Sequence, residues 1–102
     1  MIARIWHGTT RAGKADEYLN FLRNRAIPEY SSISGNLAAY VLRRIEGEKA
    51  HFLTVSFWDS MGSVREFAGE SPEKAVYFPE DDDFLLDFER EVVHYEAFDT
   101  VG

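Results

Sequence analysis

Three histidines, His7, His51 and His94, are the side chains of this sequence best suited to moving protons near neutral pH or to binding a metal ion. They lie in three separate β-prone segments. Because the end of one antiparallel strand lies beside the start of the next, all three could meet at one end of a sheet as a three-histidine metal site. Separate roles are the alternative: His51 as a solvated edge residue, His94 as a partly buried or interface residue, and His7 as a hydrogen-bonded residue that ends its strand.

A run of four acids, Glu80 to Asp83, is the other candidate for metal binding or catalysis. Calcium-binding loops alternate their ligands with spacers and a glycine, whereas consecutive acids point in different directions. The run follows Pro79 and leads into Phe84, Leu85 and Phe88, which have helical spacing. Proline in the first position and acids in the first turn are typical of a helix start. The sequence therefore predicts a helix here, with no metal site, and directs attention to the aromatic residues that precede it.

His7 and Tyr77 are the predicted catalytic pair, because both carry polar groups that we expect at the mouth of a pocket. A histidine can accept a phenolic proton at neutral pH, and a tyrosine hydroxyl can orient the oxyanion that results. Aromatic side chains from three segments are expected to face the same end of the sheet and to line a pocket for a flat organic ligand. These predicted substrate-binding residues are Tyr18, Phe21, Phe67 and Phe78. The alternative for all of them is ordinary core packing.

Elements in the order β-α-β-β-α-β would position these residues. A strand over Ile2–His7 precedes a helix that Thr9 or Thr10 caps and that Pro28 ends. Two strands follow, at about 37–45 and 50–58, with Gly47 at their turn, and then a short helix between Ser60 and Gly69. A last strand covers 90–98. This order predicts an α+β, ferredoxin-like sandwich whose antiparallel sheet has the spatial order 4-1-3-2, with both helices on one face.

The predicted strands carry apolar residues on both faces, as Phe57 next to Trp58 and Val92 next to Val93 illustrate. A sheet with one solvated face would alternate apolar and polar residues instead. Helices can cover only one of the two faces, so we expect a second copy of the chain to cover the other. The sequence therefore predicts a homodimer.

The composition limits the function further. A chain of 102 residues fits one domain, and the absence of cysteine excludes disulfides, thiolate metal sites and cysteine nucleophiles. A net charge of −7 argues against nucleic acid or an anionic membrane as the partner. Neither a signal peptide nor an apolar run of membrane-spanning length is apparent, so we expect a cytoplasmic protein.

Three stretches resemble the antibiotic biosynthesis monooxygenase family of dimeric α/β barrels: "MIARIWHGTT…KADEYLNFL", "FLTVSFWDSMGSVREFA" and "VVHYEAF". The resemblance covers almost the whole chain and implies a dimeric barrel of ferredoxin-like subunits. Families on this fold include cofactor-independent oxygenases of polycyclic phenols and quinone precursors, haem-degrading enzymes, and members of unassigned activity.

The haem-degrading branch has an asparagine, a tryptophan and a histidine at places that correspond here to His7, Phe67 and Tyr77. Because all three differ, we expect no haem breakdown, although tyrosine can ligate haem iron. The resemblance instead favours a cofactor-independent monooxygenase of an aromatic or quinol-type molecule. The alternative is a non-catalytic ligand-binding or stress-associated barrel, with haem binding as a third hypothesis. An open pocket with polar groups would favour the oxygenase, and a pocket filled by side chains would favour the non-catalytic protein.

Overall fold

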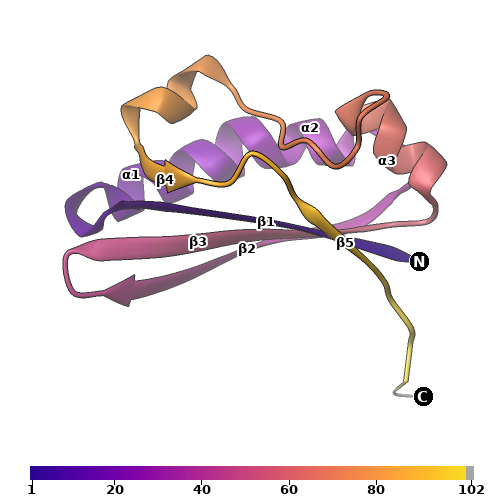
Figure 1. Ribbon diagram of the computed structural model, residues 1–102, viewed down its shortest axis with the longest axis horizontal. Helices are drawn as coiled ribbons and strands as arrows, with labels where there is room; N and C mark the ends of the chain where they lie inside the picture. The colour runs from indigo at the N-terminus through magenta and orange to yellow at the C-terminus, as the bar shows by residue number, and fades with distance from the viewer. Residues whose placement is uncertain (101–102) are drawn as a thin grey trace.

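Five antiparallel strands form one sheet, and all the helices lie against one of its faces (Figure 1). The computed structural model describes residues 1–100. The strands are β1 (Ile2–Arg11), β2 (Asn36–Glu46), β3 (Lys49–Trp58), β4 (Leu85–Phe88) and β5 (Val93–Glu96). The helical segments are η1 (Ala12–Lys14), α1 (Ala15–Phe21), η2 (Leu22–Ala26), α2 (Ile27–Ser31), α3 (Met61–Ala68) and η3 (Pro79–Asp83). No helix among residues 1–100 is long and apolar enough to cross a membrane.

The sheet order is β2-β3-β1-β4. Read from the opposite edge, this is 4-1-3-2, so the predicted order is confirmed. β1 pairs with β3 along its full length, and the β2–β3 hairpin turns at Gly47, whose φ of 60° suits glycine. The other edge of β1 is shared by two short strands. β5 pairs with its first half, and β4 pairs with Gly8, Thr9 and Thr10.

The first helical segment does not end before Pro28, so that prediction is wrong. The chain stays helical from Ala15 to Ser31, and Pro28 is at the start of α2. A proline inside an α-helix loses one hydrogen bond and its ring collides with the carbonyl four residues earlier, here that of Asn24. Asn24 lies in η2, which is a π-helix with wider turns. The wider turn makes room for the proline ring, and the helix continues past it.

The acidic run does begin a helix, but only a single 3-10 turn, η3, and the prediction that it continues to Phe88 is wrong. The Asp81 side chain accepts a hydrogen bond from the Phe78 backbone N–H at 2.7 Å and so closes the turn on itself. The chain then extends as β4. Without β4, the polar backbone groups of β1 near Thr10 would lack partners, and Thr10 is fully buried.

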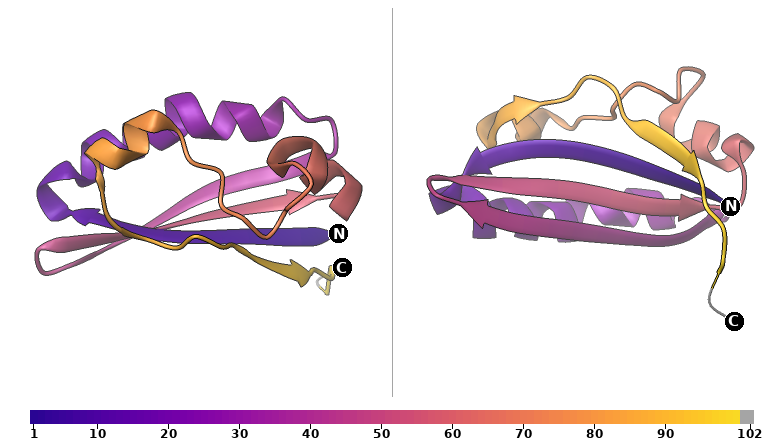
Figure 2. Two further views of the ribbon diagram at one scale, coloured as in Figure 1. Left: turned by 45° about the horizontal axis from the view of Figure 1, so that its top comes forward. Right: turned by 60° about the horizontal axis from the view of Figure 1, so that its bottom comes forward.

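The two faces of the sheet differ in what covers them (Figure 2). The covered face lies under the helices and holds the even-numbered residues of β3, from Phe52 to Trp58, all buried. The open face holds their odd-numbered neighbours, among them Leu53, Val55 and Phe57, which are partly exposed. Tyr40 and Leu42 of β2 lie opposite Val55 and Leu53 and are exposed too. These apolar side chains lie together on the open face, and no element within residues 1–100 covers them.

Candidate functional site

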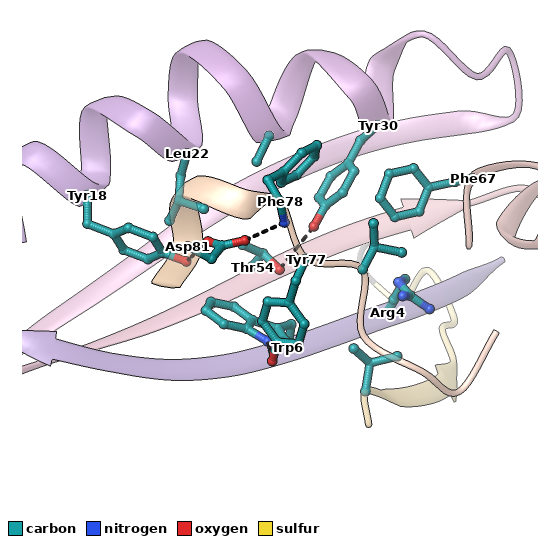
Figure 3. A pocket seen from close by; sticks show the side chains of 13 residues that line it. Arg4, Trp6, Tyr18, Leu22, Tyr30, Thr54, Phe67, Tyr77, Phe78 and Asp81 are labelled. Carbon is teal, nitrogen blue, oxygen red and sulfur yellow. Dashed lines mark hydrogen bonds between the residues drawn. The ribbon is translucent and has the colours of Figure 1, made fainter. Parts of the chain in front are cut away.

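A pocket lies between the covered face of the sheet and the helices, under the segment that leads into η3 (Figure 3). Its lining combines aromatic rings with buried polar groups and consists of Arg4, Trp6, Tyr18, Leu22, Ala26, Tyr30, Thr54, Phe67, Val76, Tyr77, Phe78, Asp81 and Val92. The open space measures only about 20 Å³, which is room for about one water molecule. A flat aromatic ligand can therefore enter only if the covering segment, residues 76–78, moves outward.

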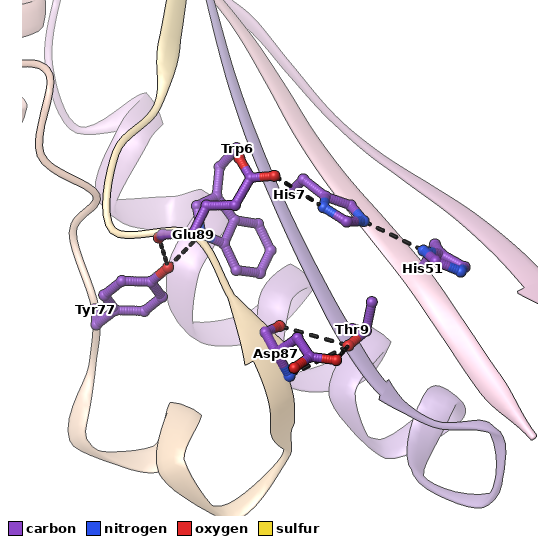
Figure 4. Close-up of polar contacts among 7 residues, drawn as sticks. All are labelled: Trp6, His7, Thr9, His51, Tyr77, Asp87 and Glu89. Atoms are coloured by element: carbon purple, nitrogen blue, oxygen red, sulfur yellow. Dashed lines mark hydrogen bonds and ion pairs between the residues drawn. The ribbon is translucent and has the colours of Figure 1, made fainter.

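Tyr77 and Trp6 form one wall of the pocket. The Trp6 indole Nε1–H donates to the Tyr77 hydroxyl at 2.7 Å, and that hydroxyl donates in turn to the Glu89 backbone carbonyl (Figure 4). The Trp6 ring lies over Gly8, where a Cβ atom would come within 2.5 Å of it. Burial raises the pKa of the Tyr77 phenol above its ordinary value, although the Trp6 hydrogen bond opposes this shift. Tyr77 is thus held as a neutral phenol with its hydroxyl already engaged.

Asp81 is an acid of this pocket that sequence reasoning missed. It is only 5% exposed, its Oδ1 accepts a hydrogen bond from the Tyr18 hydroxyl at 2.9 Å, and its Oδ2 accepts from Phe78 N–H. Burial is the main reason that the pKa of the Asp81 carboxyl is raised. The Tyr18 pKa is also raised, first by burial and then by the Asp81 charge. A carboxyl group with a raised pKa is a better proton acceptor for a weak acid such as a phenol.

Arg4 and Tyr30 form the polar part of the pocket at its other end. Arg4 is 4% exposed and donates to the backbone carbonyls of Pro72 and Lys74 at 2.5 and 3.2 Å. Its guanidinium lies 5.7 Å from the ring centre of Phe67. The Tyr30 ring packs edge-on against the same ring at 4.5 Å. Burial lowers the pKa of Arg4 and raises that of the Tyr30 phenol.

Four of the five aromatic residues predicted for the pocket line it: Tyr18, Phe67, Tyr77 and Phe78. Phe21 does not. Its ring lies behind the pocket, with its centre 5.8 Å from that of Tyr18 and 6.1 Å from that of Phe78. Phe21 therefore supports two lining residues without reaching the cavity.

His7 does not reach the pocket, so its predicted place beside Tyr77 is wrong. β1 continues to Arg11, which puts His7 in mid-strand, and neighbouring residues of a strand face opposite sides. Trp6 takes the side of the pocket, and His7 takes the open face (Figure 4). There His7 Nδ1 lies 3.2 Å from Glu89 Oε1, and its Nε2 lies 3.2 Å from His51 Nδ1.

His94 does not join the other two histidines. It lies at the far end of the sheet, where its Nε2 is 3.1 Å from Arg4 Nη1. Burial lowers the pKa of His94, and the Arg4 charge adds to this. Across residues 1–100, no three His, Cys, Asp or Glu side chains come together as metal ligands would.

The pocket residues do not fit haem ligation. Iron-bound tyrosine is a phenolate, whereas the Tyr77 phenol has a raised pKa and already donates its proton to Glu89. We therefore derive no haem chemistry for this site.

Several solved structures share the fold over the whole chain. The haem degrader MhuD from Mycobacterium tuberculosis, determined with two haems in its active site, is 20% identical, with a TM-score of 0.65 and 100% of both chains covered. A mutant of MhuD with manganese protoporphyrin IX bound gives a TM-score of 0.70 at 20% identity, over 100% of this chain and 99% of that one. A Bacillus cereus protein assigned to the antibiotic biosynthesis monooxygenases gives 0.69 at 11% identity, over 100% and 97%. At these identities the likeness shows the fold alone.

No curated protein sequence matches this chain. The model of one protein family does match, over residues 1–75, which is most of the chain. The family is described as antibiotic biosynthesis monooxygenase, and it agrees with the strand order and with the helices on a single face. This chain belongs to the antibiotic biosynthesis monooxygenase family.

Proposed function

We propose that this protein binds a flat aromatic or quinol-type molecule in the pocket of the covered face and oxygenates it without a cofactor. The observation that carries this proposal is a buried carboxylate, Asp81, in a pocket whose other walls are mostly aromatic and apolar. Such a site can accept a proton from a weakly acidic ring system and keep water away from the carbanion that forms.

The proposed reaction needs only the substrate and dioxygen. Asp81 accepts the proton of an activated ring CH₂ group, of the kind that anthrones carry, and leaves a carbanion that the ring delocalises. The carbanion adds dioxygen and takes the proton back from Asp81, which gives a hydroperoxide. The hydroperoxide loses water and leaves a carbonyl group, so one CH₂ group and one O₂ become one C=O group and one H₂O.

Asp81 takes the proton-accepting role that the sequence suggests for His7, because His7 lies on the other face of the sheet. We assign Tyr77 the role of positioning the Trp6 ring, and not a role in proton transfer. Its hydroxyl fixes the Trp6 indole at 2.7 Å, and the two rings form the wall against which a flat ligand would stack.

Non-catalytic ligand binding is the second candidate, and the small volume of the pocket, about 20 Å³, favours it. The covering segment is held at both ends. Ala75 N–H donates to the Arg90 carbonyl at 2.9 Å, and the Asp81 carboxylate ties η3 to Tyr18. A ligand that has to displace this segment could be held for long periods without being turned over.

We also propose that two copies of the chain pair through the open face. Its exposed apolar side chains include Tyr40, Leu42, Val93 and Tyr95, and grouped exposed apolar residues are typical of a protein–protein interface. Light scattering after size exclusion should give close to twice the 11.7 kDa chain mass at micromolar concentration. A chain that stays monomeric at that concentration would contradict this part of the proposal.

Oxygen uptake on a panel of anthrones, hydroquinones and flavonoid-like phenols tests the catalytic proposal. Asp81→Asn keeps an acceptor for Phe78 N–H but cannot take a proton, so the rate should fall by roughly 10²–10⁴-fold. His7→Ala changes the open face, and the rate per folded dimer should stay within about twofold of wild type, since His7 does not line the pocket. Equal rates in wild type and Asp81→Asn would remove Asp81 from the mechanism. Binding without turnover on every compound would support the non-catalytic candidate.

A further inference from the structure

Arg4 is a buried cation with no acid beside it. The chain contains 18 Asp and Glu residues, yet none within residues 1–100 forms an ion pair with Arg4. Its partners are two backbone carbonyls, the His94 ring and the face of Phe67, all of them uncharged or weakly basic. A buried charge is costly unless it is paired, and these partners offset only part of that cost.

The guanidinium also has donors to spare. It carries five N–H groups, and it forms three hydrogen bonds with residues 1–100. Because Arg4 lines the pocket, a ligand there can supply the missing negative charge. A planar guanidinium binds carboxylates best, through two parallel hydrogen bonds.

Asp81, at the other end of the pocket, lacks further hydrogen-bond donors, whereas Arg4 lacks a negatively charged partner within residues 1–100. The two Asp81 oxygens can accept about four hydrogen bonds, and Tyr18 and Phe78 supply two. Figure 3 shows Asp81 and Arg4 toward opposite ends of the pocket, with Trp6 and Tyr77 between them. A ligand with a hydroxyl group toward Asp81 and an anion toward Arg4 satisfies both ends, whereas the reversed ligand would bring two negative charges together.

We propose that the pocket takes a hydroxylated aromatic carboxylate, whose carboxylate pairs with Arg4 and whose ring hydroxyl donates to Asp81. This inference rests on the proposed function, since it names the class of ligand for the same pocket. It adds that the ligand is negatively charged and that its carboxylate points toward Arg4, neither of which the aromatic walls alone require.

A pair of probes of equal shape tests the charge: 6-hydroxy-2-naphthoate and its neutral carboxamide, titrated by calorimetry into wild type, Arg4→Gln and Arg25→Gln. Wild type should bind the carboxylate at least about tenfold more tightly, and Arg4→Gln should abolish that preference. Arg25 is the matched control, because its guanidinium packs on Phe78 at 4.7 Å but does not line the pocket. Arg25→Gln should therefore keep the preference.

The test remains possible if Arg4→Gln does not fold. The preference of wild type for the carboxylate over the carboxamide is measured without that variant. Arg4→Lys is a second variant, which keeps the charge. Equal binding of the two probes by wild type, or binding of neither, would overturn the inference. A role for Arg4 only in holding Pro72 and Lys74 would weaken both probes equally in Arg4→Gln, and that result would also overturn it. Carboxylate preference without oxygen uptake would support the inference while contradicting the proposed oxygenation.

Discussion

The covered face of the sheet buries several polar side chains, whereas the open face exposes several apolar ones. The covered face buries Arg4, Thr54 and Ser56 beneath the helices, although polar groups are costly to bury. The open face exposes Val55 and its apolar neighbours, although apolar groups gain from burial. The difference supports the two proposals, a ligand in the pocket of the covered face and a second copy of the chain on the open face.

Truncation of a large side chain should have the largest effect on the covered face. Trp58 is fully buried there and packs against Phe67 and Tyr30. Trp58→Ala should lower the free energy of unfolding by about 3–5 kcal/mol, as measured by urea denaturation. The control is Tyr95→Ala on the open face, where the side chain is 57% exposed. Its effect should depend on protein concentration, because it acts through dimerisation. A loss for Tyr95→Ala that is as large and does not depend on concentration would contradict the distinction between the faces.

A charge in the middle of the open face should separate the two copies. Val55 pairs with Ile5 and Tyr40 across the neighbouring strands, so Val55→Asp would put a carboxylate inside the proposed interface. The dissociation constant of the dimer should rise by roughly 100-fold, about 2.7 kcal/mol, as sedimentation or light scattering would show. Val55→Thr has a similar shape without the charge and should leave most of the dimer. An unchanged mass for Val55→Asp would place the interface elsewhere.

A methyl group at Gly8 should disturb the pocket wall without touching the open face. It would collide with the Trp6 ring and push the indole away from Tyr77. Gly8→Ala should lower the free energy of unfolding by about 1–3 kcal/mol and shift the Trp6 fluorescence, while the dimer mass stays unchanged. Fluorescence and stability equal to those of wild type would mean that the wall accommodates the methyl group and is not tightly packed.

Asp81 should give the covered face an unusual pH dependence. Its folded pKa lies above the ordinary 3.8, so the folded chain holds this proton more tightly than the unfolded chain. Its contribution to stability is therefore largest below pH 3.8 and declines as the pH rises through the folded pKa, by about 1.4 kcal/mol for each tenfold difference in proton affinity. Melting curves should show wild type losing stability relative to Asp81→Asn over this range. A constant difference between the two proteins would contradict the raised pKa.

Local signals predicted much of the fold. Gly47 marked the hairpin turn, and Ser60 and Gly69 marked the two ends of α3. The Ser60 side chain does accept the Ser63 N–H at 3.2 Å, and Gly69 has a φ of 87°. These positions depend on residues close in sequence, which a pattern can represent. The β-α-β-β-α-β order then limited the sheet to few topologies.

The site depended on contacts that no local pattern contains. Four consecutive acids do not reveal which one is buried, because that choice is made by Tyr18, 63 residues away from Asp81. The end of β1 was misplaced because Gly8 is a weak strand former and because Thr9 and Thr10 were interpreted as helix caps, whereas pairing with β3 and β4 keeps all three in the strand. That error of a few residues moved His7 to the wrong face.

The two tryptophan indoles allow the most direct test of the claim that the covered-face pocket is the functional site. Trp6 lines the pocket. Trp58 does not line it, and the Trp58 Nε1–H donates to Ser56 Oγ at 2.9 Å. A ¹H–¹⁵N spectrum contains one indole signal from each, and Trp6→Phe assigns them. On titration with 6-hydroxy-2-naphthoate, the Trp6 signal should move strongly and saturably, while the Trp58 signal moves little. Saturable binding that leaves the Trp6 signal in place would contradict the account, because the ligand would then bind outside this pocket.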